Sequence, residues 1–334
     1  MKRFGNDGAV RTGLLLAVIS AASFGLSGSL AGGLLAVGWS PGAIVLARIS
    51  VAALAVAPLA LADLRGRWHL VRRQAGWVIF YGAVPVALTQ FAYFSAVARM
   101  NVGPALLIEY TAPATVVIWL WLRRGERPTR RTLAGAVVCA IGLVLVLDLL
   151  AGPSLDPVGV GWALLAMMGV ASYFLLGADG PADVPPIGLA GCGLVVGSLA
   201  LGLLGATGLM PLHARTVTAH YAGTAVAWWL PPLALGIITA GVAYCAGIGA
   251  IRRLGSRVAS FVALLEVLAG IVFAWLLLGQ VPGTLQVLGA ALLIAGIIAV
   301  KLGERSPAAD NTRPPAGTGQ DSRPAERAAG AGLP

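Results

Sequence analysis

Two stretches of the sequence, LWLRRGERPTRRTLAGAVVCAIGLVLV at Leu120–Val146 and AWLLLGQVPGTLQVLGAALLIAGIIAV at Ala274–Val300, align without a gap. The alignment pairs Gly125 with Gly279, Pro128 with Pro282, and Gly135 with Gly289. Earlier in each half, Ala22-Ser23-Phe24 matches Ala171-Ser172-Tyr173. The matches predict that the chain is a duplicated unit.

The composition places most of the chain in lipid. Of the 334 residues, 58% are hydrophobic and 11% are charged, whereas about 25% are charged in a typical soluble domain. An α-helix needs about twenty apolar residues to cross the hydrocarbon core of a bilayer. The sequence therefore predicts an all-α membrane protein with ten transmembrane helices, at about 12–34, 42–62, 75–98, 102–122, 132–151, 158–178, 186–208, 228–250, 256–278 and 283–303.

The distribution of lysine and arginine predicts the orientation, because cytoplasmic loops hold the excess of these residues. With the N-terminus inside, the basic residues gather in cytoplasmic segments at 65–73, 123–131 and 252–257, and the outer loops hold Arg99 and Arg215. The loop with Asp179 and Asp183 is also expected inside, although it has no lysine or arginine. Both termini are therefore predicted to be cytoplasmic, in a multi-pass protein of the inner (plasma) membrane.

The duplication implies an inverted repeat. Ten spans in two units give five spans in each. Because five is an odd number, the second copy enters the membrane from the opposite side. The loop at 123–131 holds five arginines and its counterpart around Gln280 holds none, as inversion requires. The predicted organisation is a cytoplasmic N-terminus at 1–11, a first five-helix repeat at 12–151 and a second at 152–303. The segment 304–334 is too poor in large apolar residues to form a core, so we expect a disordered cytoplasmic tail.

These features favour one functional class. Inverted repeats are typical of secondary transporters, which bind substrate near the bilayer midplane between the repeats. The sequence has no phosphate-binding glycine loop and no nucleophile motif, so we expect a non-enzyme without cofactor or metal. The net charge of +10 is explained by the cytoplasmic loops rather than by nucleic-acid binding. Cys139, Cys192 and Cys245 lie in apolar runs and are expected to be buried thiols.

Several motifs resemble the EamA family of the drug/metabolite transporter superfamily. They are Ser23-Phe24-Gly25, Leu46-Ala47-Arg48, Gly125-Glu126-Arg127, Gly161-Trp162-Ala163 and Leu278-Gly279-Gln280. The resemblance covers about residues 12–303 and implies a ten-helix carrier made of two five-helix repeats.

Within that family, the sequence is most similar to the threonine/homoserine exporter branch. The residues that carry this likeness are Glu109-Tyr110-Thr111-Ala112-Pro113, Ser256-Arg257 and Leu265-Glu266. The sequence departs from the family at Gln280, which replaces a glutamate, and at Val267, which replaces a proline. We therefore expect a straighter ninth helix than in other members.

Arg48, Glu109 and Glu266 are the ionisable residues deep inside predicted spans, where such groups are costly and are functional candidates. Arg48 and Glu109 each lie about 10 Å from the outer end of their helix, given a rise of about 1.5 Å per residue. Two interpretations stay open for Arg48. It can form a static ion pair with Glu109, or its guanidinium can bind the carboxylate of a substrate.

Glu266 lies ten residues into the ninth predicted span, about 15 Å from the helix end and hence near the midplane. A carboxyl group at this depth can take up and release a proton during transport. The hypothesis is that Glu266 couples export to the proton gradient. The alternative is a permanently protonated side chain that hydrogen-bonds a neighbouring helix.

Aromatic and polar side chains are candidates for the wall of a substrate cavity. They are Phe24, Gln90, Tyr93, Tyr110, Trp162, Tyr173 and Tyr244. The alternative for each aromatic residue is simple packing between helices.

The sequence-based hypothesis is a secondary active transporter that exports a small metabolite, an amino acid or a drug-like compound, by alternating access with proton coupling. The expected partners are the substrate, the proton and the lipid bilayer, without nucleic acid, and the expected state is a monomer or homodimer. Two alternatives remain, a non-transporting membrane sensor and a lipid-handling or enzymatic membrane protein.

Overall fold

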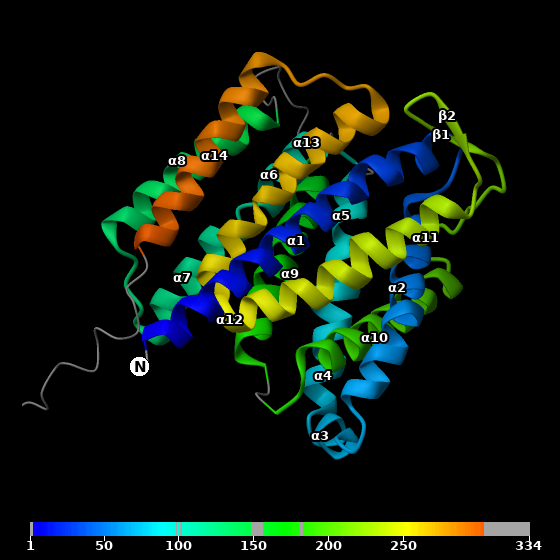
Figure 1. Ribbon diagram of the computed structural model, residues 1–334. Coiled ribbons are helices and arrows are strands. Elements are labelled where there is room, and N and C mark those ends of the chain that lie inside the picture. The colour runs from blue at the N-terminus through cyan, green and yellow to red at the C-terminus, as the bar shows by residue number, and fades with distance from the viewer. Residues whose placement is uncertain (1–2, 98, 101, 148–155, 181–182, 304–334) are drawn as a thin grey trace, which may run out of the picture. The chain divides into compact units, whose positions relative to one another are not determined.

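The computed structural model describes residues 3–97, 99–100, 102–147, 156–180 and 183–303. The predicted tail at 304–334 and the end of the predicted fifth span lie outside these residues. The described chain is mainly helical (Figure 1). Its elements are α1 (Arg3–Ala36), α2 (Pro41–Asp63), α3 (Trp68–Arg73), α4 (Ala75–Tyr81), η1 (Gly82–Leu88), α5 (Thr89–Val97), α6 (Val102–Glu109), α7 (Ala112–Arg124), α8 (Arg130–Val146), α9 (Pro157–Asp179), α10 (Pro186–Ala206), β1 (Ala219–Tyr221), β2 (Thr224–Val226), α11 (Leu230–Gly236), η3 (Ile237–Val242), α12 (Ala243–Ala263), α13 (Leu265–Leu278) and α14 (Thr284–Gly303).

Eight helices in the described part of the chain are long and apolar enough to cross a membrane. Their outer faces expose large apolar side chains, for example Leu54 and Leu122, as a surface in contact with lipid does. Two predicted spans do not form one continuous helix of that length. The helix for 132–151 is α8, with 17 described residues, and the span at 256–278 is divided between α12 and α13. Ten spans and cytoplasmic termini therefore stay predictions.

The helices α8 and α14 pack directly on each other (Figure 1). A Cβ atom on Gly135 would lie 2.7 Å from the carbonyl oxygen of Gly296, and one on Gly142 would lie 2.8 Å from that of Gly289. The alignment of the two repeats makes Gly135 equivalent to Gly289 and Gly142 equivalent to Gly296. Gly135 therefore approaches Gly296, the equivalent of Gly142, and Gly142 approaches Gly289, the equivalent of Gly135. The two helices pair in antiparallel order. Such reciprocal contacts are the mark of a two-fold relation, and the antiparallel order agrees with inverted repeats.

Hydrogen bonds at the ends of these helices repeat the symmetry. The Thr129 hydroxyl at the start of α8 donates to the Gly303 carbonyl at the end of α14, at 2.9 Å. The Gln286 amide near the start of α14 donates to the Val146 carbonyl at the end of α8, at 3.2 Å. Each helix start therefore satisfies a carbonyl group that the other helix leaves free at its end.

Replacement of Gly142 by alanine is expected to destabilise the protein, because the new methyl group would overlap the backbone of α14. Overpacking of this kind costs about 1–3 kcal/mol, so the midpoint of thermal unfolding in detergent should fall. Gly202→Ala in α10 is the matched control, because a Cβ there meets nothing within 4 Å and alanine favours a helix more than glycine does. Equal unfolding temperatures for the two variants would contradict the close approach of α8 and α14.

Interruptions occur at equivalent places in the two halves. The π-helical segment η1 in the third predicted span corresponds to η3 in the eighth. Between α6 and α7 the helix stops at Tyr110, and between α12 and α13 it stops at the equivalent Leu264. The ninth predicted span is interrupted at Leu264 although Val267 replaces the proline, and the expectation that it is straighter than in other members stays a prediction. The interrupted segments bring irregular backbone to the middle of the bundle.

A small sheet corrects the all-α prediction. Strands β1 and β2 form an antiparallel hairpin between α10 and α11. Ala222 and Gly223 at its turn have φ of 48° and 77°, the backbone that a two-residue hairpin turn requires. The Tyr221 hydroxyl donates to the Leu30 carbonyl of α1 at 2.6 Å, and burial raises the pKa of Tyr221 to about 12. The hairpin is thereby attached to the end of α1.

Candidate functional site: a cavity between the two repeats

A cavity of about 800 Å³ lies between helices of both repeats. Its wall includes parts of α1, α2, η1, α5 and α6 from the first half and of α12 and α13 from the second. Gly28 borders this cavity, and a Cβ on it would meet nothing within 4 Å. The size is within the range of small-molecule sites, about 300–1,000 Å³.

The cavity extends toward one end of the helices. Its lining reaches Val146 at the end of α8 and Gln280 and Pro282 after α13. These residues lie at the end opposite the arginine-rich loop 123–131.

Arg48 is held in the cavity wall by the second half of the chain. Its side chain is buried, with 6% exposed. Its Nη2 donates to the Thr239 carbonyl of η3 at 2.7 Å, and its Cζ lies 5.5 Å from the centroid of the Phe24 ring, a cation–π distance. Its Nε has no hydrogen-bond partner among the residues that the structure describes. One buried donor of this guanidinium is therefore left unsatisfied by the described residues.

A static ion pair between Arg48 and Glu109, one of the two interpretations of Arg48, does not occur among the ion pairs of the described residues. In the described ranges, the ion pairs are Arg124–Asp179 and Arg257–Glu126, and neither involves Arg48. Equal depth in the membrane did not make the two side chains partners, because the π-helical segment η3 presents a carbonyl group to the guanidinium. Both residues nevertheless border the cavity.

Two carboxyl groups lie beside the interruptions and border the same cavity. Glu109 is the last residue of α6 and Glu266 lies in the first turn of α13. The Tyr110 side chain is close enough to interact with Glu266. Because a helix carries partial positive charge at its N-terminus and partial negative charge at its C-terminus, an ionised Glu266 is favoured by its helix and an ionised Glu109 is not. The two carboxyl groups therefore lie in different electrostatic environments.

The aromatic candidates divide into two groups. Phe24, Tyr93, Tyr110, Tyr173 and Tyr244 border the cavity, as does Gln90. Trp162 does not, and this corrects its assignment to the site. It packs edge-on against Phe91, with ring centroids 5.6 Å apart, because its position on α9 faces α5 rather than the space between the repeats.

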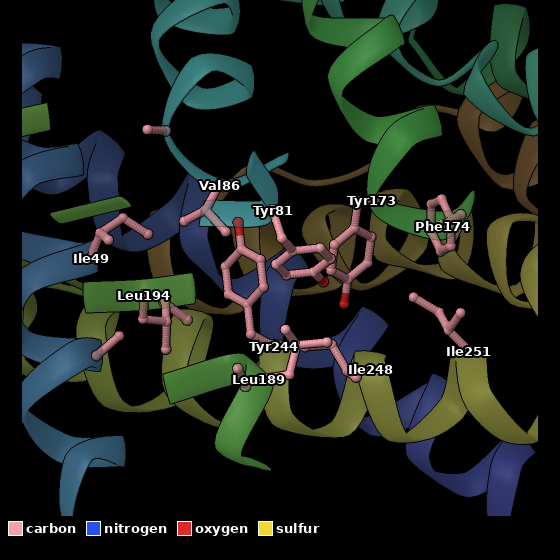
Figure 2. Packing of buried hydrophobic residues seen from close by; sticks show 14 of the residues in the cluster. Ile49, Tyr81, Val86, Tyr173, Phe174, Leu189, Leu194, Tyr244, Ile248 and Ile251 are labelled. Atoms are coloured by element: carbon pink, nitrogen blue, oxygen red, sulfur yellow. The ribbon is translucent and has the colours of Figure 1, made fainter. Parts of the chain in front are cut away.

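A row of packed tyrosines lies in the buried core beside the cavity (Figure 2). The ring centroids of Tyr244 and Tyr173 are 5.7 Å apart, and those of Tyr173 and Tyr81 are 6.1 Å apart. The row continues to Trp77, which stacks on Tyr81. The hydroxyls of Tyr81 and Tyr173 are buried and have no hydrogen-bond partner within the described part of the chain.

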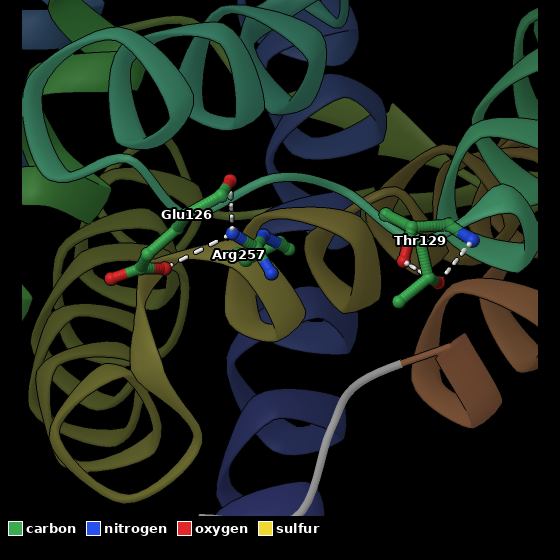
Figure 3. A network of polar contacts seen from close by, with 4 residues as sticks. Glu126, Thr129 and Arg257 are labelled. Atoms are coloured by element: carbon green, nitrogen blue, oxygen red, sulfur yellow. Dashed lines mark hydrogen bonds and ion pairs between the residues drawn. The ribbon is translucent and has the colours of Figure 1, made fainter. Parts of the chain in front are cut away.

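An ion pair joins the two halves at the arginine-rich loop 123–131 (Figure 3). Arg257 Nη2 lies 3.0 Å from Glu126 Oε2 and 3.5 Å from the Glu126 carbonyl oxygen. Arg124 pairs with Asp179 in the same region. The residue equivalent to Glu126 is Gln280, which borders the cavity. The ion pair was not predicted from the sequence, although the replacement of a carboxylate by Gln280 in the second repeat was a signal that the two ends differ.

No group of three or more histidine, cysteine, aspartate or glutamate side chains that could hold a metal occurs in the described ranges. Cys139 is buried, and Cys192 and Cys245 are half-buried. The ionisable groups of the cavity are thus one guanidinium and two carboxyls, which suit an organic ligand with charged or polar groups.

Comparison with known proteins agrees with this architecture. A solved structure described simply as the crystal structure of a protein is similar to this chain with a TM-score of 0.69 and 21% sequence identity, over 89% of this chain and 97% of that one. At this identity the similarity concerns the fold. The model of the EamA-like transporter family matches twice, over residues 11–148 and 157–302. These two matches include nearly all of the described helices, and the chain therefore belongs to the EamA-like transporter family, whose members are membrane transporters.

Proposed function

We propose that this protein is a secondary transporter that exports a small polar metabolite, an amino acid or a drug-like compound, in exchange for protons. The observation that carries the proposal is the cavity between the halves, which is lined by Arg48, Glu109 and Glu266. Arg48 has a buried donor that lacks a partner among the described residues. Because a guanidinium binds carboxylates in a fixed geometry, Arg48 is the proposed site for the substrate carboxylate.

The charges of the cavity suggest how protons take part. With both glutamates ionised, one guanidinium and two carboxylates leave a net charge of −1, which attracts a cationic or zwitterionic substrate. Protonation of Glu266 removes one negative charge and weakens the attraction. Alternate binding of substrate and proton at the same cavity is sufficient for antiport, and an inward proton gradient then drives the substrate outward.

The proposed conformational change moves the two repeats against each other around the cavity. We infer that the structure is the state open around Gln280, and that the arginine-rich end is held closed by the tyrosine row and by the Glu126–Arg257 pair. In the opposite state this pair would separate, and the open end around Gln280 would close. An exporter of this design loads its substrate in that second state.

Glu126→Gln is expected to increase the population of the state open at the arginine-rich end. The Arg257 side chain is 13% exposed and the Glu126 side chain 46%, so the pair is worth up to about 1 kcal/mol, or about fivefold in the equilibrium. The measurement is the rate at which a water-soluble maleimide labels a cysteine at Ile248. This residue is fully buried beside the tyrosine row, and the three native cysteines are replaced beforehand.

The control for this experiment is the reversed pair. Glu126→Arg combined with Arg257→Glu restores opposite charges and should return the labelling rate toward that of the parent. If the single substitution labels at the parent rate, or the reversed pair labels like the single substitution, the ion pair does not hold this end closed.

Transport itself is tested by counterflow with purified protein in liposomes that are preloaded with one amino acid at a time. The proposal expects saturable uptake of a labelled amino acid without any imposed gradient. If no amino acid shows counterflow, the screen moves to drug-like compounds, and failure of these as well would overturn the proposed function.

A further inference from the structure

A second hollow lies on the outside of the bundle, near the arginine-rich end. It has a volume of about 350 Å³ and is lined by apolar residues of α2, α3, α4 and α10. Several lining side chains are large and exposed, among them Leu61 and Ile79 at 55%, Trp68 at 43% and Val195 at 42%. The groove is separate from the cavity between the repeats, since the two share no lining residue. An apolar groove that opens on the outer face of a membrane protein is in contact with lipid.

Four arginines are close in sequence to the groove residues Leu64, Trp68 and Val71. Arg65 and Arg67 follow α2, and Arg72 and Arg73 form the last turn of α3. All four are exposed, and none forms an ion pair with any residue in the described ranges. The acidic residue nearest in sequence, Asp63, accepts a hydrogen bond from the Gly188 backbone at 3.2 Å. The positive charge of these arginines is therefore not neutralised by the protein.

The combination of groove and charge selects one kind of occupant. A neutral lipid would fill the groove without using the arginines, and a free phosphate would use the arginines without the groove. We propose that this groove binds one anionic phospholipid, with an acyl chain beside Leu64 and Val78 and the phosphate among Arg65, Arg67, Arg72 and Arg73. The indole of Trp68 lies at the edge, where tryptophan is favoured at the membrane interface. This site does not depend on the proposed transport activity.

The groove lies on the arginine-rich side of the membrane, which agrees with the binding of an anionic lipid. Anionic lipids are concentrated in the cytoplasmic leaflet, and each basic residue near its surface contributes about a fivefold preference for them. The short helix α3 keeps Arg72 and Arg73 beside two groove residues, Trp68 and Val71. The site is thus composed of one short helix and the ends of the helices around it.

The test is native mass spectrometry of the full-length protein, released from detergent with equal amounts of phosphatidylglycerol and phosphatidylcholine. We expect a retained phosphatidylglycerol adduct and no matching phosphatidylcholine adduct. Arg72→Gln with Arg73→Gln should weaken phosphatidylglycerol binding about 30-fold. The matched control is Arg130→Gln with Arg131→Gln, which removes the same charge from exposed positions that do not line the groove.

A second variant tests the apolar part of the site. Val195→Trp fills the mouth of the groove without a change of charge and should also remove the adduct, while thermal unfolding shows that the protein is folded. Glycerol 3-phosphate in excess should fail to displace the lipid. Equal retention of the two lipids, equal loss in both arginine double variants, or full displacement by glycerol 3-phosphate would each overturn the proposal.

Discussion

Glu266→Gln is expected to abolish accumulation of substrate driven by a pH gradient, while exchange of substrate across the membrane continues. The side chain borders the cavity at the interruption between α12 and α13, and Tyr110 lies close enough to interact with it. Glutamine keeps the size and the hydrogen bonds of a protonated glutamate but cannot release a proton. The variant resembles the protonated state, so it should bind substrate more weakly than the ionised wild type but still exchange it, and its exchange rate should vary less with pH.

The matched control for this prediction is Asp183→Asn, which removes an exposed carboxylate from the loop before α10. This variant should accumulate substrate like the wild type. If Glu266→Gln accumulates substrate to the wild-type level with the same dependence on pH, then Glu266 is the structural, permanently protonated group of the alternative interpretation.

Arg48→Lys is expected to weaken substrate binding by about 10- to 100-fold. Hydrogen bonds to charged groups contribute about 1.5–3 kcal/mol, and about 1.4 kcal/mol corresponds to a factor of ten. Lysine keeps the positive charge but lacks the planar fork that bonds the Thr239 carbonyl and retains a further donor for a carboxylate. The measurement is the concentration of unlabelled amino acid that halves counterflow.

Two comparisons separate binding from folding at this position. The amino-acid amide, which lacks the carboxylate, should bind Arg48→Lys and the wild type about equally. Arg99→Gln removes an exposed arginine that does not border the cavity and should leave the inhibition unchanged. A uniform loss for the acid and the amide would show that Arg48 acts by holding α2 against η3, not by binding the carboxylate.

The sequence predicted best those features of the structure that follow from the duplication. The aligned glycines at 135 and 289 predicted equivalent positions, and the structure shows the contacts of these positions in the symmetric packing of α8 and α14. The resemblance to the EamA family was confirmed by matches to both halves. The finer assignment to threonine/homoserine exporters stays a prediction.

Contacts between segments far apart in the chain could not be predicted in the same way. Helix depth placed Arg48 and Glu109 at one level, but depth does not specify the direction of a side chain, and Arg48 bonds η3 instead. The same limit explains Trp162, whose motif is shared with the family but whose side chain packs on Phe91. The π-helical segments depend on packing between helices, for which a single sequence gives no direct signal.

The central claim, export of a small metabolite in exchange for protons, is tested most directly in liposomes with a pH-sensitive dye inside and a labelled amino acid outside. With an acidic interior, the account predicts uptake of the amino acid above equilibrium together with a rise in internal pH that requires the substrate. Saturable uptake without any substrate-dependent change of internal pH would contradict proton exchange and leave a carrier that only equilibrates its substrate.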